Sequence, residues 1–315
     1  MNNVVLQTQN LTKRYGSLTA VNDLTLQVYE GEVFGFLGPN GAGKTTSINM
    51  MCGLLKPDAG QVLLHGKLLS AGDKAMRRRV GVCPQEVVLW ERLTCLEQLQ
   101  FIAQMYGLER QTARQRSEKL LEELDLAEKR NQQALKLSGG MKRRLNLALA
   151  LVHDPDIVVL DEPEAGLDPQ SRVKVREYIQ SLARSKTVIL TTHNMDEAER
   201  LADRVAIIDH GQLLVLDTPE ALKGRLGQGD VLEISLNGQA IKAENAIRIL
   251  AQEGIPAVLD ASHAVLTVRA LNAANLLPPI LEALAMADIR PGEVRLRANT
   301  LEDVFLQLTG RMLRE

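Results

Sequence analysis

The sequence contains a glycine-rich segment whose residue types and spacing fit the binding of phosphate groups. Residues 38–46 match the pattern G-x-x-x-x-G-K-[ST] at every fixed position. Glycines let backbone N–H groups converge on phosphate oxygens with no Cβ in the way. We expect Lys44 to contact the β- and γ-phosphates of a nucleoside triphosphate, and the Thr45 hydroxyl to bind Mg²⁺. The expected nucleotide contacts are Gly38, Pro39, Asn40, Gly41, Ala42, Gly43, Lys44, Thr45 and Thr46.

Two adjacent carboxylates follow a short apolar run at residues 157–160. Open α/β sheets bind ligands beyond the carboxyl ends of their strands, so this pair is expected near the phosphates. We assign Asp161 to Mg²⁺, through a water molecule, and Glu162 to the general base that activates or positions the attacking water. An Asp-Glu pair also occurs in ordinary solvated turns, but the glycine-rich loop upstream favours the functional interpretation.

A second helix start with two glycines predicts a second anion site. Ser138 is the expected N-cap of a helix, and Gly139 and Gly140 leave its first amides bare. The chain therefore has two anion sites but only one nucleotide loop. This combination suggests one ATP bound between two copies of the chain, each copy supplying the site that the other lacks. GTP is disfavoured because the chain contains no Asn-Lys pair for a guanine-reading segment.

A parallel sheet with crossover helices is needed to bring these residues together. Residues 32–37 form an apolar run directly before the glycine-rich loop, and helix-like segments separate the later apolar runs. The first 30 residues nearly alternate and predict antiparallel strands, whereas residues 90–153 have a helical period and predict an inserted helical subdomain. The fold class is therefore α/β. The later apolar runs lie at 157–160, 187–190 and 205–208.

The last third of the chain predicts a small domain of its own. Gly224, Gly227 and Gly229 mark the boundary, which gives one domain at 1–225 and an accessory domain at 226–315. Thr300 and Asp303 predict a capping box at the start of a final helix. The other elements follow a split βαβ, ferredoxin-like α+β order, with strands at 231–236, 257–260, 264–268 and 293–296 and helices at 243–252 and 273–285.

Composition limits the partners and the compartment. With 37 Lys and Arg against 39 Asp and Glu, the net charge of −2 gives no electrostatic case for nucleic-acid binding. Three cysteines fit neither a disulfide framework nor a zinc ribbon, which predicts a cytoplasmic protein. No charge-free stretch exceeds 12 residues, against the ~20 that a membrane-spanning helix needs. Any membrane role is therefore expected to come through a partner.

In the order of these motifs, residues 1 to about 225 resemble the nucleotide-binding subunit of an ATP-binding cassette (ABC) transporter. The resemblance implies ATP and Mg²⁺ as cofactors and ATP hydrolysis as the reaction, with a P-loop ATPase core joined to an antiparallel β subdomain and a helical subdomain. It implies that Tyr15 stacks on adenine and that Gln85 links Mg²⁺ to the membrane subunit. It also implies that Ser138, Gly139 and Gly140 contact the γ-phosphate held by the opposing subunit.

Two further residues take roles from the resemblance. Asp168 ends the D-loop that crosses the dimer, and His193 is the switch histidine. His193 also follows the apolar run at 187–190, which places it beyond the carboxyl end of a strand, within reach of the same γ-phosphate. Glu164 departs from the family, which commonly has a hydroxyl or a small residue at this position.

The resemblance implies a separate transmembrane permease and a second nucleotide-binding subunit. The two nucleotide-binding subunits are expected to form a homodimer attached to the inner face of the cell membrane. The tail at 299–310 is similar to tails of exporter subunits of the daunorubicin-resistance, nodulation-factor and sodium-extrusion types, which favours export. A soluble ABC ATPase acting on ribosomes or DNA is an alternative, disfavoured by the single phosphate loop and by the 94 residues that separate Lys44 from Ser138. A small-molecule kinase would leave Ser138 and His193 unexplained.

Two basic runs, at 77–79 and 142–144, are interpreted as solvated surface. The remaining histidines are interpreted as turn or surface residues; they are His65, His153, His210 and His263.

Overall fold

A computed structural model describes residues 3–69, 73, 78–183, 185–225, 230–237, 239, 243–260 and 264–310. The chain divides into two compact units, and the division falls between Pro219 and Glu220, at the start of helix α8 (Pro219–Gly224). This is a few residues before the boundary proposed from the sequence. Of the glycines that suggested that boundary, Gly227 and Gly229 lie outside the described residues.

A four-stranded antiparallel sheet in the first unit contains the N-terminal strands. Its order is β2-β1-β4-β5, and the predicted antiparallel pairing of the first strands is confirmed. Alternate residues of β2, among them Leu24, Leu26 and Val28, are buried and pack into one core with Phe34, Phe36 and Ile48. The sheet is thereby fixed against the strand and helix that flank the glycine-rich loop. The strands are β1 (Val4–Tyr15), β2 (Leu18–Tyr29), β4 (Ala59–Leu64) and β5 (Lys67–Leu68).

The six-stranded sheet of the first unit carries the residues expected to do chemistry. Its order is β10-β9-β3-β8-β7-β6, and all neighbours are parallel except the edge strand β10. Every residue of β3, β7 and β8 is buried, as the continuous apolar runs predict for strands covered on both faces. The strands are β3 (Val33–Leu37), β6 (Val80–Cys83), β7 (Ile157–Asp161), β8 (Thr187–Thr192), β9 (Arg204–Asp209) and β10 (Gln212–Asp217).

The order of this sheet brings three strand ends together. Strand β8 lies between β3 and β7, with Leu37 opposite Thr192 and Asp161 opposite Thr191. The carboxyl ends of these strands therefore form one edge, from which the glycine-rich loop, Glu162 and His193 continue.

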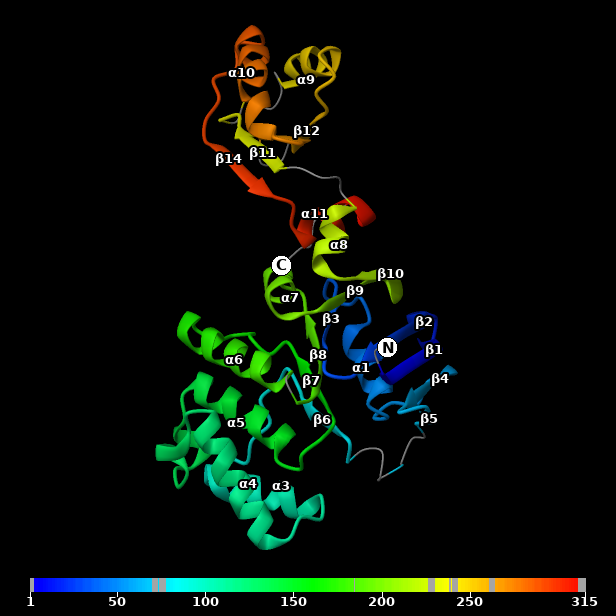
Figure 1. Ribbon diagram of the computed structural model, residues 1–315, viewed down its shortest axis with the longest axis vertical. Helices are drawn as coiled ribbons and strands as arrows, with labels where there is room; N and C mark the ends of the chain where they lie inside the picture. The colour runs from blue at the N-terminus through cyan, green and yellow to red at the C-terminus, as the bar shows by residue number, and fades with distance from the viewer. Residues whose placement is uncertain are drawn as a thin grey trace. The chain divides into compact units, whose positions relative to one another are not determined.

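The predicted helical subdomain is present, and its helices gather beside the sheet (cyan to green in Figure 1). Helices α3, α4 and α5 share one core, and a capping box formed by Thr94 and Glu97 starts α3. The helices of the first unit are α1 (Lys44–Met51), α3 (Cys95–Met105), α4 (Arg110–Glu123), α5 (Gly139–Leu151), α6 (Pro169–Leu182) and α7 (Met195–Leu201). Within the described residues, none of these or later helices has the length and apolar character needed to cross a membrane.

The second unit has the strand and helix order of a split βαβ fold. Its sheet order is β12-β13-β11-β14 with every pair antiparallel, and the capping box at Thr300 and Asp303 is confirmed. The predicted helix at 273–285 is instead a 3-10 helix (Ala273–Leu276) followed by α10 (Leu277–Met286), because prolines occupy the first turn of α10 and suit only a helix start. The other elements are β11 (Asp230–Ser235), α9 (Ala243–Gln252), β12 (Ala257–Asp260), β13 (Val265–Ala270), β14 (Val294–Ala298) and α11 (Leu301–Thr309).

Candidate active site

A cavity of about 390 Å³ opens at the carboxyl edge of the parallel sheet. Most of the residues expected to bind nucleotide or metal line it, together with Thr19, Ala20 and the His210–Gly211 turn, which the sequence did not suggest. Gly38 and Ala42 belong to the same loop but do not line the cavity. The expected residues among its lining are Tyr15, Pro39, Asn40, Gly41, Gly43, Lys44, Thr45, Thr46, Gln85, Asp161 and Glu162.

The glycine-rich loop has the conformation that its glycines permit. Gly43 has a φ of 99°, and a Cβ there would lie 2.3 Å from the Ala20 carbonyl oxygen. A larger residue would therefore clash with the backbone and adopt a strained conformation. Lys44 starts α1 directly after this glycine, so the first amides of the helix and the Lys44 ammonium face the same cavity.

Lys44 lies among oxygen atoms of its own loop and beside the carboxylates. Its Nζ donates to the carbonyls of Gly38 (2.6 Å) and Pro39 (3.1 Å), and it lies 3.9 Å from Oε1 of Glu162. Burial lowers the pKa of Lys44, while the charges of Glu162 and Asp161 oppose this shift. The site thus holds a buried cation next to two carboxyl groups, an arrangement suited to the triphosphate of a nucleotide.

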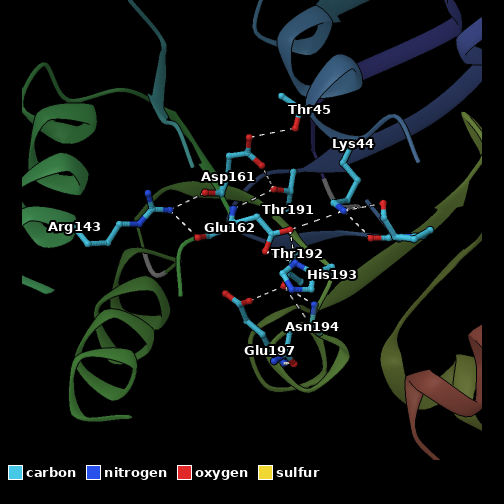
Figure 2. A network of polar contacts seen from close by, with 12 residues as sticks. Lys44, Thr45, Arg143, Asp161, Glu162, Thr191, Thr192, His193, Asn194 and Glu197 are labelled. Atoms are coloured by element: carbon cyan, nitrogen blue, oxygen red, sulfur yellow. Dashed lines mark hydrogen bonds and ion pairs between the residues drawn. The ribbon is translucent and has the colours of Figure 1, made fainter. Parts of the chain in front are cut away.

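Asp161 and Thr45 meet at the same point (Figure 2). The Thr45 hydroxyl donates to Oδ2 of Asp161 at 3.4 Å, and the Thr191 hydroxyl donates to Oδ1. A hydroxyl and a carboxylate are oxygen ligands of the kind that Mg²⁺ prefers, and Mg²⁺ usually completes its shell with waters and phosphate oxygens. The described residues contain no group of three His, Cys, Asp or Glu that would form an all-protein metal site. The donor set therefore fits Mg²⁺ bound together with a nucleotide.

Glu162 and His193 form a close pair next to Lys44. Nδ1 of His193 lies 2.9 Å from each carboxylate oxygen of Glu162. The Glu162 side chain is buried, whereas the side chain of His193 is 45% exposed. Glu162 also has a φ of 48°, in the left-handed region, which turns its side chain out of the line of β7 toward the cavity.

The residues predicted to form the second anion site lie elsewhere in the chain. The Ser138 hydroxyl caps α5 by accepting from the Met141 amide at 3.3 Å, which confirms the predicted N-cap. A Cβ on Gly140 would meet Ser171 at 2.4 Å and Asp168 at 3.8 Å, so the Ser138 turn and Asp168 share one surface. None of Ser138, Gly139, Gly140 and Asp168 lines the cavity that contains Lys44.

The interpretation of residues 142–144 as solvated surface is wrong for two of the three. Arg143 and Arg144 are buried, at 3% and 8% exposure, and Arg143 reaches the backbone of Asp161 and Glu162 (Figure 2). The helical period gives a signal for this burial, because Arg144 and Arg143 lie three and four residues, respectively, before the buried Leu147. In the other run, Arg78 and Arg79 are exposed and Arg77 lies outside the described residues.

One of the histidines interpreted as turn or surface residues is a buried turn residue. His153 lies in a turn but is only 9% exposed; its ring stacks on Tyr106 with centroids 3.8 Å apart, and burial lowers its pKa to about 4. His263 lies outside the described residues.

Glu164, the residue that departs from the family pattern, is buried and receives two hydrogen bonds from Arg176, at 2.9 and 2.7 Å.

Glu197 is a buried carboxyl group under the His193 turn that was not predicted from the sequence. Its Oε2 accepts from the Thr192 hydroxyl at 2.6 Å, and its amide donates to Oδ1 of Asn194 at 3.1 Å. The Asn194 amide in turn donates to the Thr192 hydroxyl at 2.9 Å. Burial raises the pKa of Glu197 to about 8, and the charges of Glu164 and Glu162 add to this shift. Burial therefore favours the protonated form of Glu197 at neutral pH, against the hydrogen bond from Thr192, which favours the ionised form.

A parallel sheet, a phosphate-binding loop and a carboxylate beside the buried lysine define a nucleoside triphosphatase. The sequence profile of the ABC transporter family matches residues 21–165. The chain is 36% identical to the linearmycin resistance ATP-binding protein LnrL of Bacillus subtilis, over 99% of this chain and 100% of that protein. It is 42% identical to the Nod factor export ATP-binding protein I of Burkholderia orbicola, over 98% of this chain and 97% of the relative.

Solved structures agree with this assignment. The dimeric, post-hydrolysis state of the ATP-binding cassette MJ0796 bound to ADP and Pi is 26% identical, with a TM-score of 0.62 over 68% of this chain and 98% of that chain. The chain belongs to the ABC transporter family as an ATP-binding subunit, and it is an ATPase that couples hydrolysis to transport. The P-loop α/β fold expected from the sequence is confirmed.

The raised pKa of Glu197 makes stability depend on pH. The folded protein keeps the Glu197 proton up to about pH 8, whereas an unfolded chain releases it near 4.5. The stabilisation is complete below pH 4.5 and is lost as the pH rises toward 8, in total on the order of a few kcal/mol. Glu197→Gln removes this dependence. We expect the melting temperature to fall less between pH 5 and pH 8 for the variant than for the wild type. Parallel curves of melting temperature against pH would contradict this assignment.

Proposed function

We propose that this chain is the ATP-hydrolysing subunit of an ABC exporter and that it acts as a pair of copies on a separate membrane permease. One observation carries the proposal. The cavity lined by Lys44, Asp161 and Glu162 contains none of Ser138, Gly139 and Gly140, although these residues form a helix start suited to anions. A second copy facing the first would supply the missing contact.

The side chains take separate roles in this proposal. Lys44 and the amides of the loop bind the β- and γ-phosphates, and Tyr15, 51% exposed at the cavity wall, stacks on adenine. Glu162 accepts a proton from the attacking water or orients it, and His193 holds the Glu162 carboxylate and reaches the γ-phosphate. Mg²⁺, held by Thr45, Asp161 and Gln85, would neutralise charge that develops on the phosphate oxygens.

The pair of copies supplies the remaining contacts. Ser138, Gly139 and Gly140 of one copy contact the γ-phosphate held by the other, and Asp168 lies beside them on the same surface. Binding of two ATP molecules closes the pair because each nucleotide bridges both copies, and hydrolysis removes the bridge. The solved dimeric cassette with ADP and Pi supports this view.

Glu162→Gln tests the catalytic role. The amide keeps the size of the side chain but cannot accept a proton from water, so we expect turnover to fall by about 100-fold or more. MgATP affinity should stay close to that of the wild type, and the ATP-bound pair should accumulate in gel filtration. Near-normal ATP hydrolysis by the variant would refute the role of Glu162.

An apolar groove next to Gln85 supports a permease docking site. The groove has a volume of about 370 Å³ and lies between β6, α3 and α5. Trp90, Phe101 and Val88 are 44%, 48% and 62% exposed around it, and the Trp90 and Phe101 rings meet edge to face at 5.5 Å. Large apolar side chains exposed together mark interaction sites. We assign the groove to a short cytoplasmic segment of the permease with apolar anchoring side chains.

Trp90→Glu tests the docking site. The charge should weaken association with the permease in membranes by about 10-fold or more, because it would be buried against an apolar partner. ATP hydrolysis by the isolated subunit should be unchanged, since Trp90 does not line the nucleotide cavity. Val258→Glu, at a 64% exposed position of the second unit, is the control. Equal membrane association of the two variants would exclude the groove as the docking site.

The direction of transport is proposed from the relatives. The Nod factor relative is an export protein by name and LnrL is a resistance protein by name, and the chain matches both over nearly their whole length. With the permease in the membrane and ATP supplied from the cytoplasm, the pair would lie on the inner face of the cell membrane. The transported compound is a property of the permease.

A further inference from the structure

Arg143 directs all of its N–H groups to backbone carbonyl oxygens. A guanidinium has five N–H donors in one plane, and each of them is used in this protein. Arg143 is 3% exposed, and no ion pair involves it in the part of the chain that the structure describes. Nε donates to Pro163 (3.1 Å), Nη1 to Pro84 (2.7 Å) and Gln85 (2.9 Å), and Nη2 to Asp161 (2.7 Å) and Glu162 (2.8 Å).

These carbonyls belong to two segments that end neighbouring strands. Pro84 and Gln85 follow β6, whereas Asp161, Glu162 and Pro163 end and follow β7. Arg143 itself lies in the second turn of α5, whose first turn is capped by Ser138. One side chain therefore joins the two strand ends of the nucleotide cavity to the helix that begins with the second anion site.

The hydrogen bonds from Arg143 stabilise an unusual backbone conformation at Glu162. Its φ of 48° is a left-handed conformation that residues other than glycine rarely adopt. The Glu162 amide donates to the carbonyl and hydroxyl oxygens of Thr191, at 3.1 and 3.2 Å. Arg143 binds the carbonyls on both sides of the strained residue. Without Arg143 the Glu162 carbonyl would keep, among the described residues, only the bond from the Ala165 amide, at 3.1 Å, which lies within the same turn. That bond does not join the turn to α5 or to the segment after β6.

We propose that Arg143 is a positioning residue for ATP hydrolysis, which holds the Glu162 turn and the Gln85 segment in fixed relation to the helix that begins at Ser138. The inference rests on the roles proposed above for Glu162 and Gln85. Through Arg143, a displacement of the Ser138 end of α5 on contact with the facing copy is transmitted to the backbone that carries Glu162. Helix α5, whose start contacts the nucleotide held by the facing copy, is thereby joined to the Glu162 carboxylate, which acts on the nucleotide held by its own copy.

Arg144 provides a matched control. It is the next residue of α5, it is also buried, and its Nη1 donates to the Leu124 carbonyl at 2.6 Å, within the helical subdomain. No hydrogen bond among the described residues joins it to the nucleotide cavity. Loss of Arg144 therefore removes a buried guanidinium from the same helix but breaks no hydrogen bond to the ends of β6 and β7.

The test compares Arg143→Gln and Arg143→Lys with Arg144→Gln in the full chain. We expect turnover of Arg143→Gln to fall by about 10- to 100-fold, since the carboxylate is misplaced rather than removed. MgATP affinity should change by less than about threefold, because Lys44 and its loop are untouched. Lysine supplies three donors from a single point, so Arg143→Lys should retain intermediate turnover. Arg144→Gln should keep turnover within about threefold of the wild type.

Hydrogen exchange gives a readout that does not depend on activity. In both Arg143 variants, peptides covering 84–90 and 160–166 should exchange faster together, whereas in Arg144→Gln they should not. Arg143→Lys carries the test if Arg143→Gln does not fold. Turnover of the Arg143 variants equal to that of Arg144→Gln, or faster exchange in only one of the two segments, would overturn the proposal. Normal turnover of Glu162→Gln would instead refute the role of Glu162 alone, since the exchange result tests the linkage separately.

Discussion

The parallel register of β3, β8 and β7 is the constraint on which the site depends. Because Leu37 pairs with Thr192 and Asp161 with Thr191, the loop after β3, the carboxylates of β7 and the histidine after β8 leave the sheet at one edge. Burial of these strands on both faces fixes that register, since the neighbouring helices and the antiparallel sheet cover them. The positions of Lys44, Glu162 and His193 therefore follow from the packing of apolar residues that take no part in the chemistry.

Around this edge, charge and backbone conformation are held by groups from several elements. The buried ammonium of Lys44 lies 3.9 Å from Glu162, and His193 contacts the same carboxylate from the other side. The strained backbone of Glu162 is bonded by Thr191 on its amide side and by Arg143 on its carbonyl side. Catalysis by preorganised charges needs such rigidity, because the groups must already point at the position of the reacting phosphate. In the proposed pair of copies, the remaining contact comes from the Ser138 turn of the facing chain.

Local sequence was enough to predict the elements and most of the cavity. The glycine-rich loop, the buried strands and the split βαβ order of the last third each have a pattern within a short window, and the structure confirms them. Glu197 was missed although its partners Thr192 and Asn194 are only five and three residues away, because that spacing indicates a helix start and not the burial of the carboxyl group. Arg143 was missed because its partners are not marked in the sequence: it binds carbonyls 18 to 59 residues away. Carbonyl acceptors are present at every residue, so no side-chain pattern identifies them. The helix at 273–285 was drawn too long because the period continues through the 3-10 turn that precedes the prolines.

The central claim is that each chain supplies one half of each of two ATP sites, and that the facing copy supplies the other halves. Mixing two inactive variants tests this claim most directly. Lys44→Ala disables the phosphate loop and Ser138→Arg disables the helix start, so each variant alone should lack ATPase activity. In an equimolar mixture, mixed pairs contain one intact site. If pairs form at random and sites act independently, we predict about a quarter of wild-type ATP hydrolysis. A mixture no more active than the two variants measured separately would contradict the claim.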